Sequence, residues 1–411
     1  MTHVGNSSFS KALRETFTAY AFDLFGLIAG FLVAYQLGVF RLSPWAIALY
    51  PAVLGAKGVI EGLLSGRLST ALHLGTVHPR FSKNTKSFHN LIEATIVLTL
   101  ITSVAMSAIS LVFGNLFWGI TFLDFPAILG VVVATMALGL ALLVVTVKVA
   151  FFSFKKGLDP DVMVFPIMSV VASIFITICY VITLNLFLLN SPVGIGTVAL
   201  LGVAHLLIVI YIFPRNLHEL EFVKTIKESL ASLMIVALIV NVTGTLLKGI
   251  DGRFVRTRGY SEIYLVYPAL IGLVSDVGSV IGSTATTKLA LGMLKPKLSS
   301  IGHHAKTILT SWLASIVMFI ILAFAVFLIR GASTGIFTSA TFYSYVVVLL
   351  VANVIAVTLI MILSFAISIL TFQKGLDPGN FVIPIENAFA ASVTSIALLL
   401  ALALLSLGSV I

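Results

Sequence analysis

Ionisable side chains interrupt three long apolar stretches of the sequence. An ionisable group inside a membrane span costs at least a few kcal/mol, and such groups usually mark ion pathways. Lys57 and Glu61 stand four positions apart, so they share one helix face and could neutralise each other. Asp276 is surrounded by glycines and serines, which allow close helix contact and leave space for a hydrated ion. The remaining groups of this kind are Arg67, Lys288 and Glu386.

The elements that carry these groups must cross a membrane. The chain has 411 residues, of which 59% are hydrophobic and 9% are charged. Soluble domains carry about 25% charged residues, so a soluble protein is excluded. The apolar runs are long and unbroken, unlike the short alternating segments of membrane barrels. Since a span needs about 20 apolar residues, we predict an all-α integral membrane protein with about eleven transmembrane helices. They cover 17–40, 45–75, 89–118, 122–152, 161–189, 194–213, 228–249, 262–292, 305–330, 340–371 and 380–410.

Basic residues predict the orientation of these helices. With the N-terminus in the cytosol, most of the 24 lysines and arginines fall in inside loops, although a cluster at 248–258 opposes this. Loops rich in Lys and Arg usually stay inside. We therefore expect a cytosolic N-terminus and an outside C-terminus, in the plasma (cell) membrane.

Two phrases occur twice. "GLDPDVMVFPI" begins at Gly157 and "GLDPGNFVIPI" begins at Gly375, 218 positions later. "YPAVLGAKG" at Tyr50 and "YPALIGLVS" at Tyr267 are 217 positions apart. The repetition predicts two five-span repeats, 1–190 and 217–411, joined by a linking transmembrane helix at 191–216. An odd span between five-span units makes the repeats parallel, related by a pseudo-two-fold axis along the membrane normal. One chain would then suffice for one pore.

The repeated phrases also carry candidate functional residues. Asp159 and Asp377 can cap the helix that follows each, or can supply an acidic residue at a cation exit. Pro166 and Pro384 fall inside spans, where proline frees a backbone carbonyl. Such carbonyls are tolerated where a neighbour or a water-filled cavity satisfies them. We therefore expect a central cavity lined by spans two and five of each repeat.

At these residues the chain resembles the MgtE-type magnesium transporters, and more closely their eukaryotic solute-carrier relatives with two such domains in one chain. The resemblance rests on "LGAKGVIEGLLSGRLST" (54–70), the matching "YPALIG" and both "DP…P" phrases. It implies a cation path along the pseudo-two-fold axis, built from spans two and five. Two features depart from the family. Its span-five aspartate is replaced by Ser173 and Ala391, and its span-two "GN" is Gly58-Val59 and Ser275-Asp276.

The candidate site follows from both lines of reasoning. Magnesium binds oxygen, keeps several waters and needs only one or two carboxylates. The predicted metal-contacting residues are Asp276, Glu61, Glu386, Asn387 and Ser173. The predicted pathway or gating residues are Lys57, Gly58, Arg67, Ser275, Asp159, Asp377, Pro166 and Pro384. The expected function is transport of a divalent cation, Mg²⁺ above others. Partners are the lipid bilayer and that cation, without nucleic acid, and we expect no cofactor.

Three alternatives stay open at this point. The missing span-five aspartates favour a transporter of another ion or small solute. A membrane-embedded enzyme would need a nucleophile and base at membrane depth, and the sequence contains no Gly-x-Gly-Asp, His-Glu-x-x-His or Gly-x-Ser-x-Gly motif. We therefore expect no enzyme. The last alternative is a membrane scaffold without transport.

Overall fold

The protein is an all-α membrane protein, as the sequence predicts. The computed structural model describes residues 9–58, 60, 63–156, 160–189, 191–256, 262–290, 292–335, 337–375 and 378–408. Within this described part, 10 helices are long and apolar enough to cross a membrane. They are Thr16–Tyr35, Lys86–Trp118, Phe122–Lys155, Ile167–Leu188, Pro192–Asn216, Leu220–Val255, Glu262–Leu289, Leu298–Thr334, Ser339–Gln373 and Ile385–Leu405.

The sequence predicts eleven membrane spans, and the described part of the structure has ten candidate spans. The second predicted span, 45–75, accounts for the difference. Over 45–75 the structure describes α4 (Ala46–Ala56) and α5 (Leu64–His73), and residues 59, 61 and 62 between them lie outside the described part. The sequence between them contains Gly58 and Gly62. Glycine destabilises a helix interior by about 1 kcal/mol relative to alanine. The apolar α4 alone is shorter than a full span.

The chain divides into two compact units. Unit 1 comprises Met1–Leu27 and Gly259–Ile411, and unit 2 comprises Ile28–Arg258. Helix α1 (Phe9–Tyr20) therefore belongs with the C-terminal part of the chain. Helix α11 (Leu220–Ile250), which begins the second predicted repeat, belongs with the N-terminal part. Each unit thus contains the first helix of the opposite sequence repeat.

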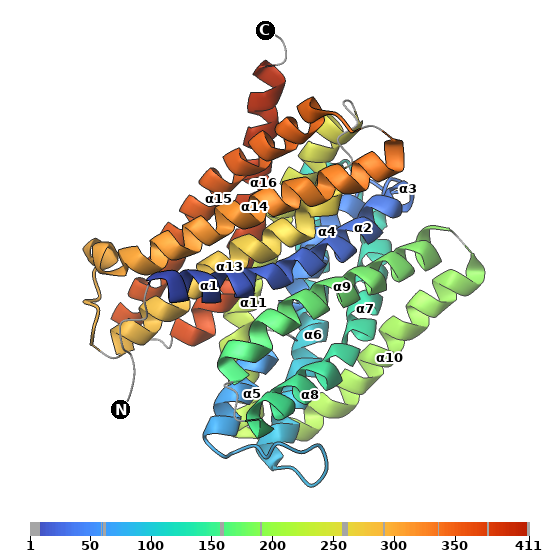
Figure 1. The fold of residues 1–411 in the computed structure, drawn as a ribbon. Helices are drawn as coiled ribbons and strands as arrows, with labels where there is room; N and C mark the ends of the chain where they lie inside the picture. Colours follow the sequence, from blue (N-terminus) through green and yellow to red (C-terminus); the bar gives the residue numbers. More distant parts are fainter. Residues whose placement is uncertain are drawn as a thin grey trace. The chain divides into compact units, whose positions relative to one another are not determined.

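Unit 1 is built around α13 (Glu262–Ala290), which contacts α14 (Ala305–Thr334), α15 (Ser339–Gln373) and α16 (Pro378–Gly408). The span on α13 is the most buried of the ten, at 78%. Helix α1 packs on α14, and the 3₁₀ turn η1 (Ala21–Phe25) packs on α13, as Figure 1 shows in dark blue and yellow. Polar side chains of α13 are therefore enclosed by neighbouring helices.

Unit 2 is built around α11, which packs on α4 and α6 (Lys86–Phe113). Its remaining helices are α2 (Gly26–Tyr35, its first two residues counted in unit 1), α3 (Leu37–Phe40), α5, α7 (Phe125–Gly139), α8 (Ala141–Lys155), α9 (Pro160–Leu188) and α10 (Pro192–Asn216). Unit 2 also has the 3₁₀ turn η4 (Phe122–Asp124) and the π-helical turns η3 (Gly114–Trp118) and η5 (Asp251–Val255). Buried hydroxyls on α6 bond within their own helix: Thr99 donates to the Thr95 carbonyl at 2.8 Å. Ser110 Oγ donates to Asn241 Oδ1 on α11 at 2.6 Å. These bonds satisfy polar groups that have no water to bond inside a membrane.

Corresponding contacts recur in the two units. Tyr50 on α4 shares a hydrogen bond of 3.0 Å with Thr177 on α9. Tyr267 on α13 shares one of 2.8 Å with Ser395 on α16. Tyr267 and Ser395 follow Tyr50 and Thr177 by 217 and 218 positions. These are the offsets of the repeated phrases, so a buried contact accompanies the sequence repeat.

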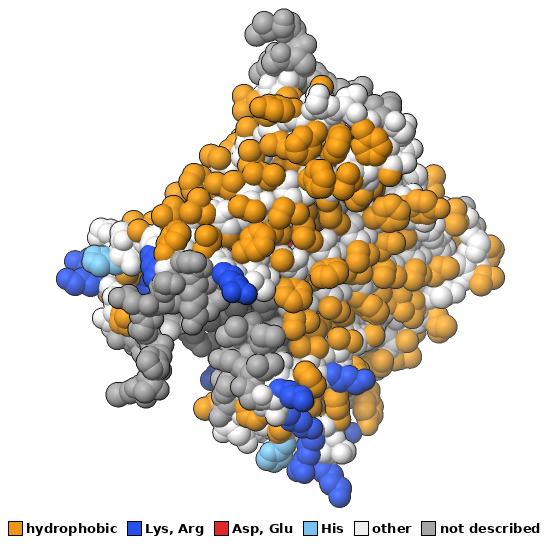
Figure 2. Space-filling view, viewed as in Figure 1, with side chains coloured by type: hydrophobic (Ala, Val, Ile, Leu, Met, Phe, Trp, Pro, Cys, Tyr) orange, Lys and Arg blue, Asp and Glu red, His pale blue; other side chains and the backbone are white. Residues whose placement is uncertain are grey.

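The exposed sides of the helices are apolar. Figure 2 shows hydrophobic side chains along the visible helix faces, with Lys and Arg gathered at helix ends. Helix α10 is the least buried of the ten spans, at 22%, and it exposes large hydrophobic side chains such as Leu200, Leu207 and Tyr211. Lipid is the solvent in which such a surface is stable.

Candidate functional site

Glu386 on α16 is the most enclosed carboxylate of the predicted site. Its side chain is fully buried, and Oε2 accepts a hydrogen bond of 2.9 Å from Ser279 Oγ on α13. Among the described residues, Oε1 accepts no hydrogen bond. A Cβ at Gly278 would overlap Oε1, so only glycine leaves room for this carboxylate. An incompletely satisfied carboxylate in a buried position costs several kcal/mol, which points to a functional reason.

Three other predicted residues lie near Glu386. Ser275 Oγ on α13 donates a hydrogen bond to Asn387 Oδ1 on α16. Asp276 is buried, and its charge acts on Glu386. The structure therefore brings Ser275, Asp276, Glu386 and Asn387 together where α13 and α16 meet in unit 1.

Sequence reasoning missed one carboxylate in the same unit. Asp23 lies in η1 and is only 4% exposed. The charges of Asp23, Asp276 and Glu386 all act on the hydroxyl of buried Tyr20. The sequence does place an acidic residue, Asp23, inside the predicted span 17–40, and this could have marked it as a candidate. That span was recognised from the length of its apolar run alone, so its single acidic residue was not considered.

The carboxyl groups of unit 1 do not form a closed metal cage. In the part of the chain that the structure describes, no three His, Cys, Asp or Glu side chains are placed to hold one metal ion together. Magnesium does not require such a cage, because it retains several waters and binds through one or two carboxylates.

Four predicted residues lie in unit 2. The buried Lys57 Nζ donates to the Ser169 carbonyl at 3.2 Å, and Arg67 Nη1 donates to Thr225 Oγ1 at 2.9 Å. Ser173 donates to the same Ser169 carbonyl at 2.8 Å. Gly58 faces open space, since a Cβ there would meet nothing within 4 Å. In the described residues, Lys57 and Ser173 therefore share one acceptor carbonyl on α9.

Some predicted residues cannot be placed. Glu61, Asp159 and Asp377 lie outside the described residues, as do the side chains of Pro166 and Pro384. Their roles stay predictions.

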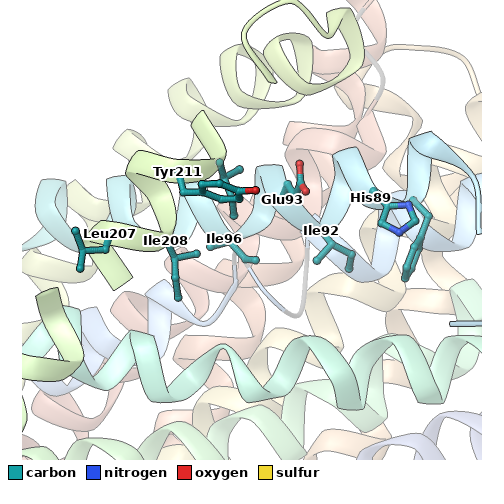
Figure 3. A pocket seen from close by; sticks show the side chains of 9 residues that line it. His89, Ile92, Glu93, Ile96, Leu207, Ile208 and Tyr211 are labelled. Atoms are coloured by element: carbon teal, nitrogen blue, oxygen red, sulfur yellow. The ribbon is translucent and has the colours of Figure 1, made fainter. Parts of the chain in front are cut away.

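A groove on the outer side of unit 2 is separate from these residues. It has a volume of about 570 Å³ and lies between α6 and α10. Figure 3 shows His89, Glu93 and Tyr211 among isoleucine and leucine side chains. The Glu93 carboxylate accepts a hydrogen bond of 2.5 Å from Asn216 Nδ2, so it already has a partner within the protein. A mostly apolar groove beside the least buried span suits lipid chains better than ions.

Comparison with models of known protein families shows to which family the chain belongs. The model described as "MgtE: Divalent cation transporter" matches residues 50–183 and 267–407. The chain belongs to the MgtE family. Comparisons with curated proteins and with solved structures give no match.

Membership of the MgtE family fixes the broad function. The chain is an integral membrane protein of a divalent cation transporter family, whose members are transporters rather than enzymes. The two matched segments confirm a duplicated MgtE-like arrangement. Asp276, Glu386 and Asn387 fall in the second segment, and Lys57 and Ser173 fall in the first.

Proposed function

We propose that this MgtE-family chain transports Mg²⁺ and that Asp276 and Glu386 contact the ion. The observation that carries the proposal is the fully buried Glu386 carboxylate, whose Oε1 accepts no hydrogen bond from the described residues. A passing cation would supply the missing partner. Ser275, Ser279 and Asn387 add neutral oxygens, which hard cations such as Mg²⁺ prefer.

The driving force would be the membrane potential. An inward-negative potential favours entry of a divalent cation by about 4.6 kcal/mol per 100 mV, twice the value for one charge. We also propose the cell membrane as the location, with a cytosolic N-terminus, an outside C-terminus and one pore per chain. The path between spans two and five of each repeat stays a prediction.

Magnesium flux into proteoliposomes tests the function. The wild type, Asp276→Asn and Glu386→Gln would be compared under an imposed potential with an internal magnesium dye. Glu221→Gln is the matched control, because Glu221 is an exposed carboxylate on α11. We expect flux in the wild type and control and loss in both site variants. Equal flux in all four would exclude Asp276 and Glu386 from the path.

Transport of another ion or small solute is the second candidate. Ser173 and Ala391 replace the aspartates expected from the resemblance, and unit 2 buries the Lys57 ammonium. A buried cation disfavours a second cation nearby. Asp276→Lys separates the two candidates, because cation flux should vanish in this variant while anion flux should survive or increase.

A further inference from the structure

Asp23 occupies a place in unit 1 that glycine keeps open. The carboxylate oxygen Oδ1 lies 2.6 Å from the point where Gly272 would carry a Cβ. Asp23 comes from η1 and Gly272 comes from α13, so the missing side chain lets a carboxylate reach the backbone of the most buried span.

The equivalent place in unit 2 holds a valine. Val240 Cγ1 lies 2.6 Å from the point where Gly55 would carry a Cβ. Val240 and Gly272 stand 217 positions after Asp23 and Gly55. The same close contact therefore exists in each unit, once with a carboxylate and once with a methyl group. Packing alone does not require an acid here, and a buried acid is costly.

Two other positions of unit 1 differ from their counterparts in unit 2 in the same direction. Tyr20 and Glu386 are fully buried in unit 1. At the offsets of 217 and 218, their counterparts in unit 2 are Ala237 and Met168, which are also fully buried. At these two positions unit 1 therefore has polar side chains where unit 2 has apolar ones.

Besides Glu386, Ser364 in unit 1 has a hydroxyl without a hydrogen-bond partner among the described residues. Ser364 Oγ on α15 is fully buried and has no hydrogen-bond partner among the described residues. It lies 2.8 Å from the point where Gly278 would carry a Cβ, the same point that Glu386 Oε1 overlaps. Two buried oxygens that lack hydrogen-bond partners in the described part of the chain thus lie close to one point between α13, α15 and α16.

We propose that Asp23 is a further ion-contacting residue, present in unit 1 alone, which meets the divalent cation in succession with Asp276 and Glu386. The proposal rests on the proposed function. Succession fits the geometry, because in the described part of the chain no three acidic side chains are placed to hold one ion together. A hydrated Mg²⁺ needs only one or two carboxylates at a time.

The test measures Mg²⁺ binding to the purified full-length chain in detergent, through the rise in Tm as MgCl₂ is added. Asp23→Asn removes the charge, and Gly272→Ala displaces the carboxylate. Gly55→Ala is the matched control, because it creates the same overlap of 2.6 Å against Val240, where no carboxylate is present. We expect Asp23→Asn and Gly272→Ala to raise the half-saturating Mg²⁺ concentration about tenfold, as for the loss of one charged contact. Gly55→Ala should leave it unchanged.

Two results would overturn the proposal. One is an unchanged half-saturating concentration in Asp23→Asn, and the other is an equal shift in Gly55→Ala and Gly272→Ala. Either result leaves the proposed function intact if the wild type still carries Mg²⁺ flux. If Mn²⁺ or Ca²⁺ but not Mg²⁺ raises the Tm of the wild type, Mg²⁺ is excluded as the bound ion. The half-saturating concentrations of that other ion in Asp23→Asn, Gly272→Ala and Gly55→Ala then test whether Asp23 contacts it. No response to any of these ions would overturn both proposals.

Discussion

Glu386→Gln should make the protein more stable and less active. The substitution keeps the shape of the side chain and removes its charge. In the wild type, Ser279 donates to Oε2, a bond to a charged group that contributes about 1.5–3 kcal/mol. Against this stands the cost of a buried charge, which is several kcal/mol per ion.

The neutral amide changes this balance in two ways. It no longer has to lose the hydration of a charge, and its carbonyl oxygen can still accept the hydrogen bond from Ser279. We therefore expect a net stabilisation of about 1–3 kcal/mol. Such a change raises Tm by a few degrees.

Thermal unfolding in detergent without divalent ions measures the stability, and proteoliposome flux measures the activity. Ser279→Ala is the companion variant, because it leaves the Glu386 carboxylate without its donor and should destabilise the protein by about 1.5–3 kcal/mol. A Glu386→Gln variant that is less stable than the wild type and transports normally would refute the reasoning. Glu386 would then be a structural residue.

Three further predictions concern packing and stability. Tyr50→Phe and Tyr267→Phe each remove one buried hydrogen bond and should lower stability equally, by about 1 kcal/mol each in thermal unfolding. Unequal losses would contradict the equivalence of the two contacts. Gly244→Ala should cost about 1–3 kcal/mol, because the new methyl group would overlap the Ala48 carbonyl of α4, which is backbone. A normal Tm would contradict this close approach. Asp251→Asn weakens the ion pairs of Asp251 with two half-exposed arginines and should lower the free energy of unfolding by only about 1 kcal/mol. Mg²⁺ flux should stay unchanged, and a loss of flux would place Asp251 on the ion path.

The sequence by itself determined the membrane class, the repeat and the family. These properties are local, because an apolar run or a repeated phrase can be recognised without knowing what it contacts. Asp276 and Glu386 were predicted as site residues in the same way, since a charge inside an apolar run stands out. The second predicted span is not among the ten candidate spans, and residues 59, 61 and 62 within it lie outside the described part.

Only the tertiary structure decided which groups meet. Sequence order groups α1 with the first repeat, whereas the structure places it in unit 1 with the C-terminal helices. Asp23 thereby reaches Gly272, a residue of the other repeat. Such a contact depends on the packing of helices that are far apart in the chain. Helical periodicity defines the faces of each helix, but not its neighbour, because any apolar helix can pack against several others.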